Sequence, residues 1–345
     1  MEQKRIAYLD VARGLAMFGV IYGHVLSRNT GLGKWIYSWH MPIFFLITAI
    51  LLSRKTEWKQ MTYRDLFVKD MKSIMYPYLV FNFIEVITMC FASSVREALK
   101  GLFHFCVFDG LQALWFLSAL FIARQMFFQL MKRTEKKEVI TACVVIVILV
   151  TSLFSAARGW VDSQNKPVYT LLYNFANIGN RTLIGFVFLV LGFVSANHLH
   201  SIRLRPFVKV VVLLCTLLFS ISLFDYNSVD LRFSKIGNPL LFYSLAIAGS
   251  VSVFILSDYI SHFRSSKVIL FMGTNSIVFL ATHIPIRDLL AFFFPSIDME
   301  YKELFFLMLI AVEYGVVWLV IRYLPYLYKF PRSQDNRKKA QHDKV

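Results

Sequence analysis

The chain has 345 residues, of which 57% are hydrophobic and only 17% are charged. A water-soluble domain of this length needs a larger polar surface, so the composition indicates a membrane protein with many spans. The formal net charge of +16 alone would also fit a nucleic-acid-binding protein. The positions of the basic residues decide between these interpretations.

Apolar segments of about 20 residues, the length that crosses a bilayer as a helix, recur along the chain. They predict an all-α polytopic membrane protein with about ten transmembrane helices. Residues 1–328 are expected to form one membrane domain, and residues 329–345 a basic, disordered tail. The expected spans are 7–27, 36–52, 76–93, 112–131, 139–156, 178–196, 207–223, 239–257, 268–290 and 303–324.

Lysine and arginine are distributed unevenly between the two sets of segments that connect these spans. With the N-terminus in the cytoplasm, the inside segments hold 23 of the 37 basic residues and the outside loops hold ten. This bias follows the positive-inside rule and predicts that both termini are cytoplasmic. The charge therefore indicates topology and contact with a lipid bilayer, and no nucleic-acid partner is expected.

The first expected span, which contains YLDVARGLAMFGVIYGH, is apolar except for Asp10, Arg13 and His24. On an ideal helix these three side chains lie on one side, with Arg13 and His24 separated by roughly 16 Å along the axis. Gly14 and Gly23 flank this polar stripe and permit close helix packing.

Two interpretations of the stripe remain open. Asp10 and Arg13 could form an i, i+3 ion pair while His24 bonds a neighbouring carbonyl. Alternatively, all three face a cavity or pathway, as ionisable groups inside a membrane usually do.

The R-x10-H spacing of Arg13 and His24 resembles the acyltransferase-3 family of bacterial membrane acyltransferases. Four further stretches resemble that family's motifs in order: WHMPIFFLITAILL, KDMKSIMYPYL, LWFLSALF and LFMGTNSIVFLATH. The resemblance covers about residues 5–325 and is closest in style to fucose and polysaccharide O-acetylases. Thr48–Ala49 stands where the family usually has Ser-Gly, and Lys69 and Lys72 replace paired arginines, so the bidentate fork is lost there.

The resemblance implies an enzyme of the bacterial cell membrane that moves an acetyl group from cytoplasmic acetyl-CoA to a hydroxyl of a cell-surface polysaccharide or its lipid-linked precursor. Arg13, Lys69 and Lys72 are the candidates for holding the phosphates of CoA by charge-assisted bonds. For the two lysines, ordinary positive-inside charge is the alternative. No metal is expected.

Within that reaction, Arg13 and His24 are the catalytic candidates. Histidine suits the general base that a sugar hydroxyl needs. A transient acetyl-histidine is the alternative chemistry. The oxyanion needs donors from other spans, and His40, Trp115 and His283 are the candidates. Capping, interface anchoring or helix cross-linking would explain the same residues without a catalytic role.

An isolated charge in an apolar segment is costly. At least one intramembrane ion pair that involves Glu85, Arg181 or Glu313 is therefore expected. Structural pairing is the favoured interpretation, and Glu313, together with Asp10, is kept as a supporting site residue. A multi-span transporter or flippase of a glycan precursor is the alternative function, although the paired repeats typical of transporters are not evident. A structural or receptor protein would gain nothing from the polar stripe.

Overall fold

The computed structural model describes residues 7–26, 30–55, 57–163, 167–201, 205–264 and 266–331. These residues are almost entirely helical, and their one isolated β contact joins Asp230 to Lys235. The all-α architecture expected from the sequence is confirmed. The expected tail falls almost wholly outside the described residues.

The first eight helices are α1 (Ala7–Val25), α2 (Gly31–Trp39), α3 (Pro42–Arg54), α4 (Glu57–Gln60), α5 (Tyr63–Asp70), α6 (Tyr76–Ala92), α7 (Val95–Cys106) and α8 (Trp115–Arg133). The others are α9 (Lys137–Ser163), α10 (Pro167–Ser201), α11 (Pro206–Leu223), α12 (Pro239–Ile260), α13 (Ser266–Thr274), α14 (Ser276–Phe293), α15 (Pro295–Glu300) and α16 (Lys302–Tyr323). A π-helical turn, Met71–Met75, joins α5 to α6.

Nine helical segments of the described chain are long and apolar enough to cross a membrane. The polytopic membrane protein expected from the sequence is thus confirmed, although α1 is not among the nine. Asp10, Arg13 and His24 lower the hydropathy of α1, so this helix needs other helices around it rather than lipid.

Two of the expected spans are interrupted. Span 36–52 is divided between α2 and α3, because Pro42 has no backbone N–H and begins a new helix. Span 268–290 is divided at Asn275, whose backbone leaves the helical conformation. The Asn275 side chain donates hydrogen bonds to the Phe271 carbonyl (2.9 Å) and the Thr274 hydroxyl (3.0 Å), which stabilises the break.

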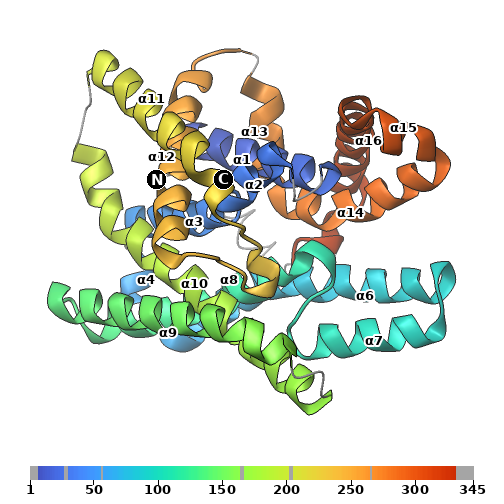
Figure 1. Cartoon of the computed structure of the whole chain (residues 1–345), viewed down its shortest axis with the longest axis horizontal. Coiled ribbons are helices and arrows are strands. Elements are labelled where there is room, and N and C mark those ends of the chain that lie inside the picture. The colour runs from blue at the N-terminus through green and yellow to red at the C-terminus, as the bar shows by residue number, and fades with distance from the viewer. Residues whose placement is uncertain are drawn as a thin grey trace, which may run out of the picture.

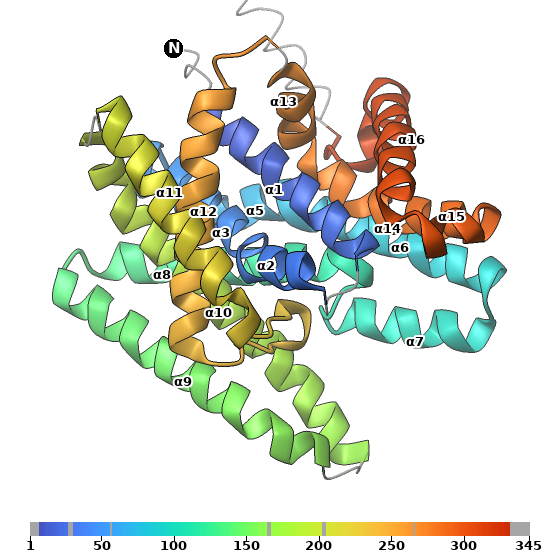
Figure 2. The same ribbon diagram turned by 45° about the horizontal axis from the view of Figure 1, so that its top comes forward.

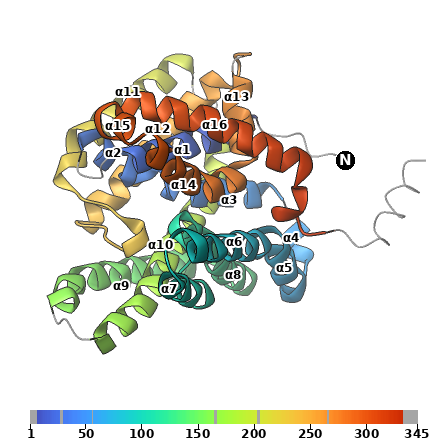
Figure 3. The same cartoon turned by 90° about the vertical axis from the view of Figure 1, so that its right-hand side faces the viewer.

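The helices form two groups on either side of α3 and α10. Helices α6–α9 lie on one side, and α1, α11, α12, α14 and α16 lie on the other (Figures 1 and 3). Helix α3 packs along α10, and α8 and α9 also contact α10. Figure 2 shows α1 running between α12, α13 and α14, so the polar stripe is enclosed by protein.

Close backbone contact joins α1 to α13. A Cβ atom on Gly14 would lie 2.1 Å from the Ile269 carbonyl oxygen, and one on Gly273 would lie 1.8 Å from the Asp10 carbonyl oxygen. The expected role of Gly14 in close packing is confirmed. Similarly, Gly192 of α10 lies against Ala49 of α3, which stands where the family usually has glycine. Because Gly192 has no side chain, it leaves room for the methyl group of Ala49.

The expected ion pair is present. Arg181 of α10 is buried and pairs with Asp109 at 2.9 Å, and it donates to the Asp109 carbonyl at 2.6 Å. A second, part-buried pair is bidentate: Arg124 Nε and Nη2 donate to the two oxygens of Asp70 at 2.9 and 2.7 Å. The first pair ties α10 to the segment between α7 and α8, and the second ties α8 to the end of α5.

We expect Gly273→Ala to lower the melting temperature of the detergent-solubilised protein, because the added methyl group forces α13 away from α1, at a cost of about 1–3 kcal/mol. The matched control is Gly315→Ala on α16, where a Cβ atom would meet nothing within 4 Å. The control should melt at the wild-type temperature or slightly above it. Equal melting temperatures for the two variants would contradict this packing.

Candidate active site

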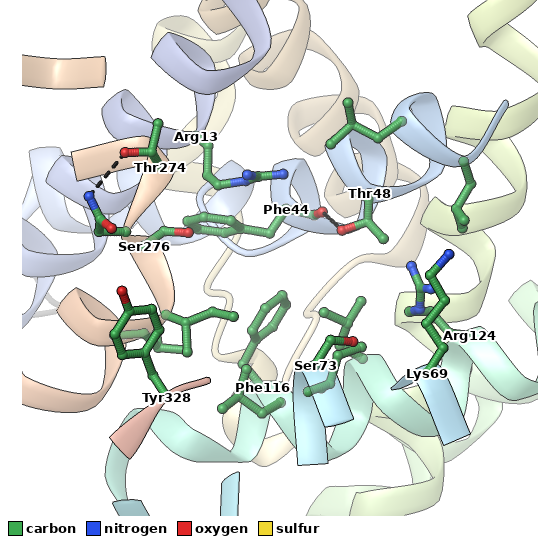
Figure 4. A pocket seen from close by; sticks show the side chains of 18 of the residues that line it. Arg13, Phe44, Thr48, Lys69, Ser73, Phe116, Arg124, Thr274, Ser276 and Tyr328 are labelled. Atoms are coloured by element: carbon green, nitrogen blue, oxygen red, sulfur yellow. Dashed lines mark hydrogen bonds between the residues drawn. The ribbon is translucent and has the colours of Figure 1, made fainter. Parts of the chain in front are cut away.

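A first cavity lies between α1, α3, α8 and the broken segment of α13 and α14. Its volume is about 390 Å³, and Arg13, Thr48, Lys69, Ser73 and Tyr328 are among the residues that line it. Figure 4 shows Arg13 and Phe44 on one wall and Phe116 and Ser73 on the facing wall.

Four basic side chains surround this first cavity: Arg13, Lys55, Lys69 and Arg124. Arg13 also pairs with Asp10 at 3.6 Å, as one interpretation of the stripe expected. Asp10 itself lines neither cavity. The cluster of positive charge fits a polyanionic ligand such as the phosphate groups of a nucleotide.

Two of these cations were not anticipated from the sequence. Lys55 looked like one more positive-inside residue, and Arg124 lay within an expected span. Conversely, Lys72 does not line the cavity, and its ammonium lies 5.3 Å from the centre of the Phe330 ring. Lys69 and Lys72 point in different directions because Lys69 lies in the last turn of α5, whereas Lys72 lies in the π-helical turn.

The second cavity, of about 750 Å³, lies at the other end of α1 and is lined by His24, Tyr37, His40 and Trp115. The sequence named three of these four residues, and the fold brings them together from α1, α2 and α8. Tyr37 was missed, although it lies three residues before His40 and therefore on the same side of that helix.

His283 of α14 lies against His24, with 5.1 Å between the ring centres, but it does not line the cavity. Its Nδ1 is 2.9 Å from the Phe279 carbonyl, and the Nδ1 of His40 is 2.8 Å from the Ile36 carbonyl. In a neutral ring this places the proton on Nδ1 and leaves Nε2 as an acceptor. Neither ring, when neutral, can then stabilise an oxyanion through Nε2.

Glu313 lies fully buried on α16, away from both cavities. One carboxylate oxygen is 3.4 Å from the Thr282 hydroxyl, and the other has no hydrogen-bond partner among the described residues. Glu313 therefore joins α16 to the helix that carries His283. This arrangement fits a supporting role rather than contact with a ligand.

Three helices, α1, α8 and α14, line both cavities, so the cavities lie one after the other along these helices. Along α1, Met17 lines the first cavity and Val20 lines the second, and Leu280 of α14 lines both. Three residues span about 5 Å of helix, so the wall between the cavities is about one turn thick. Arg13 and His24 lie on opposite sides of this wall.

The fold and these cavities define a polytopic membrane protein with two separate internal cavities. The sequence profile of the acyltransferase domain family matches residues 6–322. The chain therefore belongs to the acyltransferase-3 family and is a membrane acyltransferase. Searches of curated proteins and of solved structures found no match.

We expect the two cavities to open on opposite faces of the membrane, and engineered cysteines test this. In a background without the four native cysteines, Ser73→Cys in the first cavity and Ser228→Cys in the second should react with membrane-impermeant thiol reagents added from opposite sides. Leu153→Cys, on the exposed face of α9, is the lipid-facing control and should react from neither side. Labelling of both cavity positions from one side would contradict the arrangement.

Proposed function

We propose that the protein is an O-acetyltransferase that moves an acetyl group from cytoplasmic acetyl-CoA to a hydroxyl of a cell-surface polysaccharide or its lipid-linked precursor. The single observation that carries the proposal is the division of the stripe, with Arg13 in one cavity and His24 in the other. Donor and acceptor that begin on opposite sides of a membrane need two such compartments.

The first cavity is the proposed donor site and opens to the cytoplasm. Arg13, Lys55 and Lys69 supply positive charge for the phosphates of CoA. This orientation puts both termini in the cytoplasm of a bacterial cell membrane, in agreement with the distribution of basic residues along the sequence. The narrow pantetheine arm would then carry the thioester toward the wall at Leu280.

The second cavity is the proposed acceptor site. His24 takes the proton from the acceptor hydroxyl as the oxygen attacks the thioester carbonyl, so a C–O bond forms and the C–S bond breaks. The leaving thiolate receives that proton, which leaves CoA and an O-acetyl ester. In the alternative route, His24 carries the acetyl group transiently before the hydroxyl attacks.

Transfer requires the thioester to pass the wall that separates the cavities. The wall is about one helical turn thick, so a short displacement of Leu280 and Met17 would join the two compartments. The proposed oxyanion donor is the indole N–H of Trp115, because His40 and His283 hold their Nδ1 protons against backbone carbonyls.

A transporter or flippase would also have cavities on both sides of a membrane. The family match covers residues 6–322 and includes the R-x10-H pair, and this favours acyl transfer. No contact in the described structure favours transport over transfer.

Replacing the proposed base tests the reaction directly. We expect His24→Ala to reduce CoA release from acetyl-CoA in nanodiscs by a factor of about 10²–10⁴, because the acceptor hydroxyl loses its general base. CoA release is measured with a thiol reagent, and size-exclusion chromatography checks that the variant folds. Turnover at the wild-type rate would remove the assignment of His24.

Replacing the proposed donor-site arginine separates binding from catalysis. We expect Arg13→Ala to raise the KM for acetyl-CoA roughly tenfold, because one charge-assisted contact to a phosphate is lost. Lys72→Ala is the matched control and should leave the KM within twofold, because this lysine lies outside the donor cavity. A loss of kcat with an unchanged KM in Arg13→Ala would contradict the placement of Arg13.

A further inference from the structure

The cavity that holds His24 is markedly basic. One acidic residue, Asp230, is found among the described residues that line it. Its basic lining residues are Lys34, Arg232, Lys235 and Arg287. A neutral sugar has no need of such charge, whereas an anionic one would be attracted to it.

These cations are unexpected on the outer side of a membrane protein. In the proposed orientation the outside segments hold ten of the 37 basic residues of the chain, and four of those ten line this one cavity. The positive-inside rule does not explain a cluster of cations on the outer side. A ligand that needs positive charge does explain it.

Nearby carboxylates neutralise only part of this charge. Lys34 pairs with Asp225 at 2.7 Å, and Arg287 pairs with Asp288 at 2.5 Å. Neither carboxylate lines the cavity. Glu85 lies within electrostatic range of Arg232 but is also outside the lining.

Lys235 differs from the other three cations. It is exposed, and its side chain has no hydrogen bond or ion pair with any of the residues that the structure describes. An anionic ligand could therefore bind this ammonium without first displacing a partner from it.

The loop between α11 and α12 holds Arg232 and Lys235 in place. Its backbone forms a tight hairpin in which Asp230 and Lys235 exchange hydrogen bonds of 2.7 and 2.9 Å. At its base, the Asn227 side chain donates to the Ile236 carbonyl (3.1 Å) and accepts from the backbone N–H of Asn238 (2.9 Å).

Helix α10 secures the tip of the same loop. The buried Ser234 hydroxyl donates to the Asn177 carbonyl at 3.1 Å, and Arg181 donates to the Arg232 carbonyl at 3.2 Å. Arg181 is itself fixed by Asp109. The backbone that carries the two loop cations is therefore fixed at the cavity, so the loop loses less entropy when a ligand binds there.

The fourth cation connects the basic lining to the proposed base. Arg287 Nη1 donates to the backbone carbonyl of His24 at 3.2 Å, so α14 and the end of α1 are held together beside the cavity. An anion bound among these cations would thus lie in the same compartment as the imidazole of His24.

We propose that the acceptor is an anionic saccharide, whose carboxylate or phosphate group binds Arg232 and Lys235 while a neighbouring hydroxyl faces His24. This inference rests on the proposed function. The planar guanidinium of Arg232 suits bidentate contact with either anion, and Lys235 adds a point charge.

The experiment compares matched acceptors with the full-length protein in nanodiscs supplied with acetyl-CoA. Glucuronate against glucose tests a carboxylate, and N-acetylglucosamine 1-phosphate against N-acetylglucosamine tests a phosphate. We expect kcat/KM for at least one anionic member to exceed that of its neutral partner roughly tenfold, the value of one hydrogen bond between charged groups. The arm that shows the preference identifies the anion.

Variants connect the preference to the loop. Arg232→Gln and Lys235→Gln should each raise the KM for the preferred anionic acceptor roughly tenfold and reduce the ratio of anionic to neutral turnover. The control is Lys100→Gln on α7, which pairs with Glu97 outside the cavity and should preserve the ratio.

The outcomes separate this inference from the proposed function. Equal or better use of the neutral sugars, a ratio unchanged in both loop variants, or CoA release that no anionic sugar stimulates would each overturn the anionic acceptor. Failure to release CoA under any condition would instead overturn the proposed acetyl transfer.

Discussion

The structure depends on one constraint: lipid cannot solvate the polar stripe of α1. An aspartate, an arginine and a histidine on one helix are costly against hydrocarbon, so other helices must surround them. The fold meets this requirement with α12, α13 and α14, and the glycine contacts between α1 and α13 bring the backbones close enough to exclude lipid. Arg13 and His24 of the enclosed stripe then line one cavity each.

For the proposed transfer of an acyl group across a membrane, the wall between the cavities has a physical advantage. A continuous polar channel would let water and ions through, whereas a wall of Met17, Val20 and Leu280 keeps the compartments separate. Because the wall is about one helical turn thick, small movements suffice to connect the proposed donor cavity with the proposed acceptor cavity. The break at Asn275 comes directly before α14, the helix that carries Leu280.

Much of the architecture could be predicted because hydropathy and helical periodicity are local properties. Most expected spans correspond to single helices, and the shared side of Arg13 and His24 follows from 3.6 residues per turn. The breaks before Pro42 and at Asn275 were not predicted, although proline and asparagine are the signals that mark them. Lys55 and Arg124 could not be separated from ordinary membrane-flanking charge without knowing which helices meet.

By itself, the sequence determined the class of protein, the family and the separation of Arg13 and His24 along one helix, because length, apolarity and motif spacing are local properties of the chain. Tertiary structure alone decided that the stripe lies inside, that a wall divides its two ends, and that the loop cations Arg232 and Lys235 reach the compartment of His24. The reason is that burial and electrostatic proximity depend on contacts between segments distant in sequence. Nothing in the spacing of residues 24 and 232 predicts that they meet.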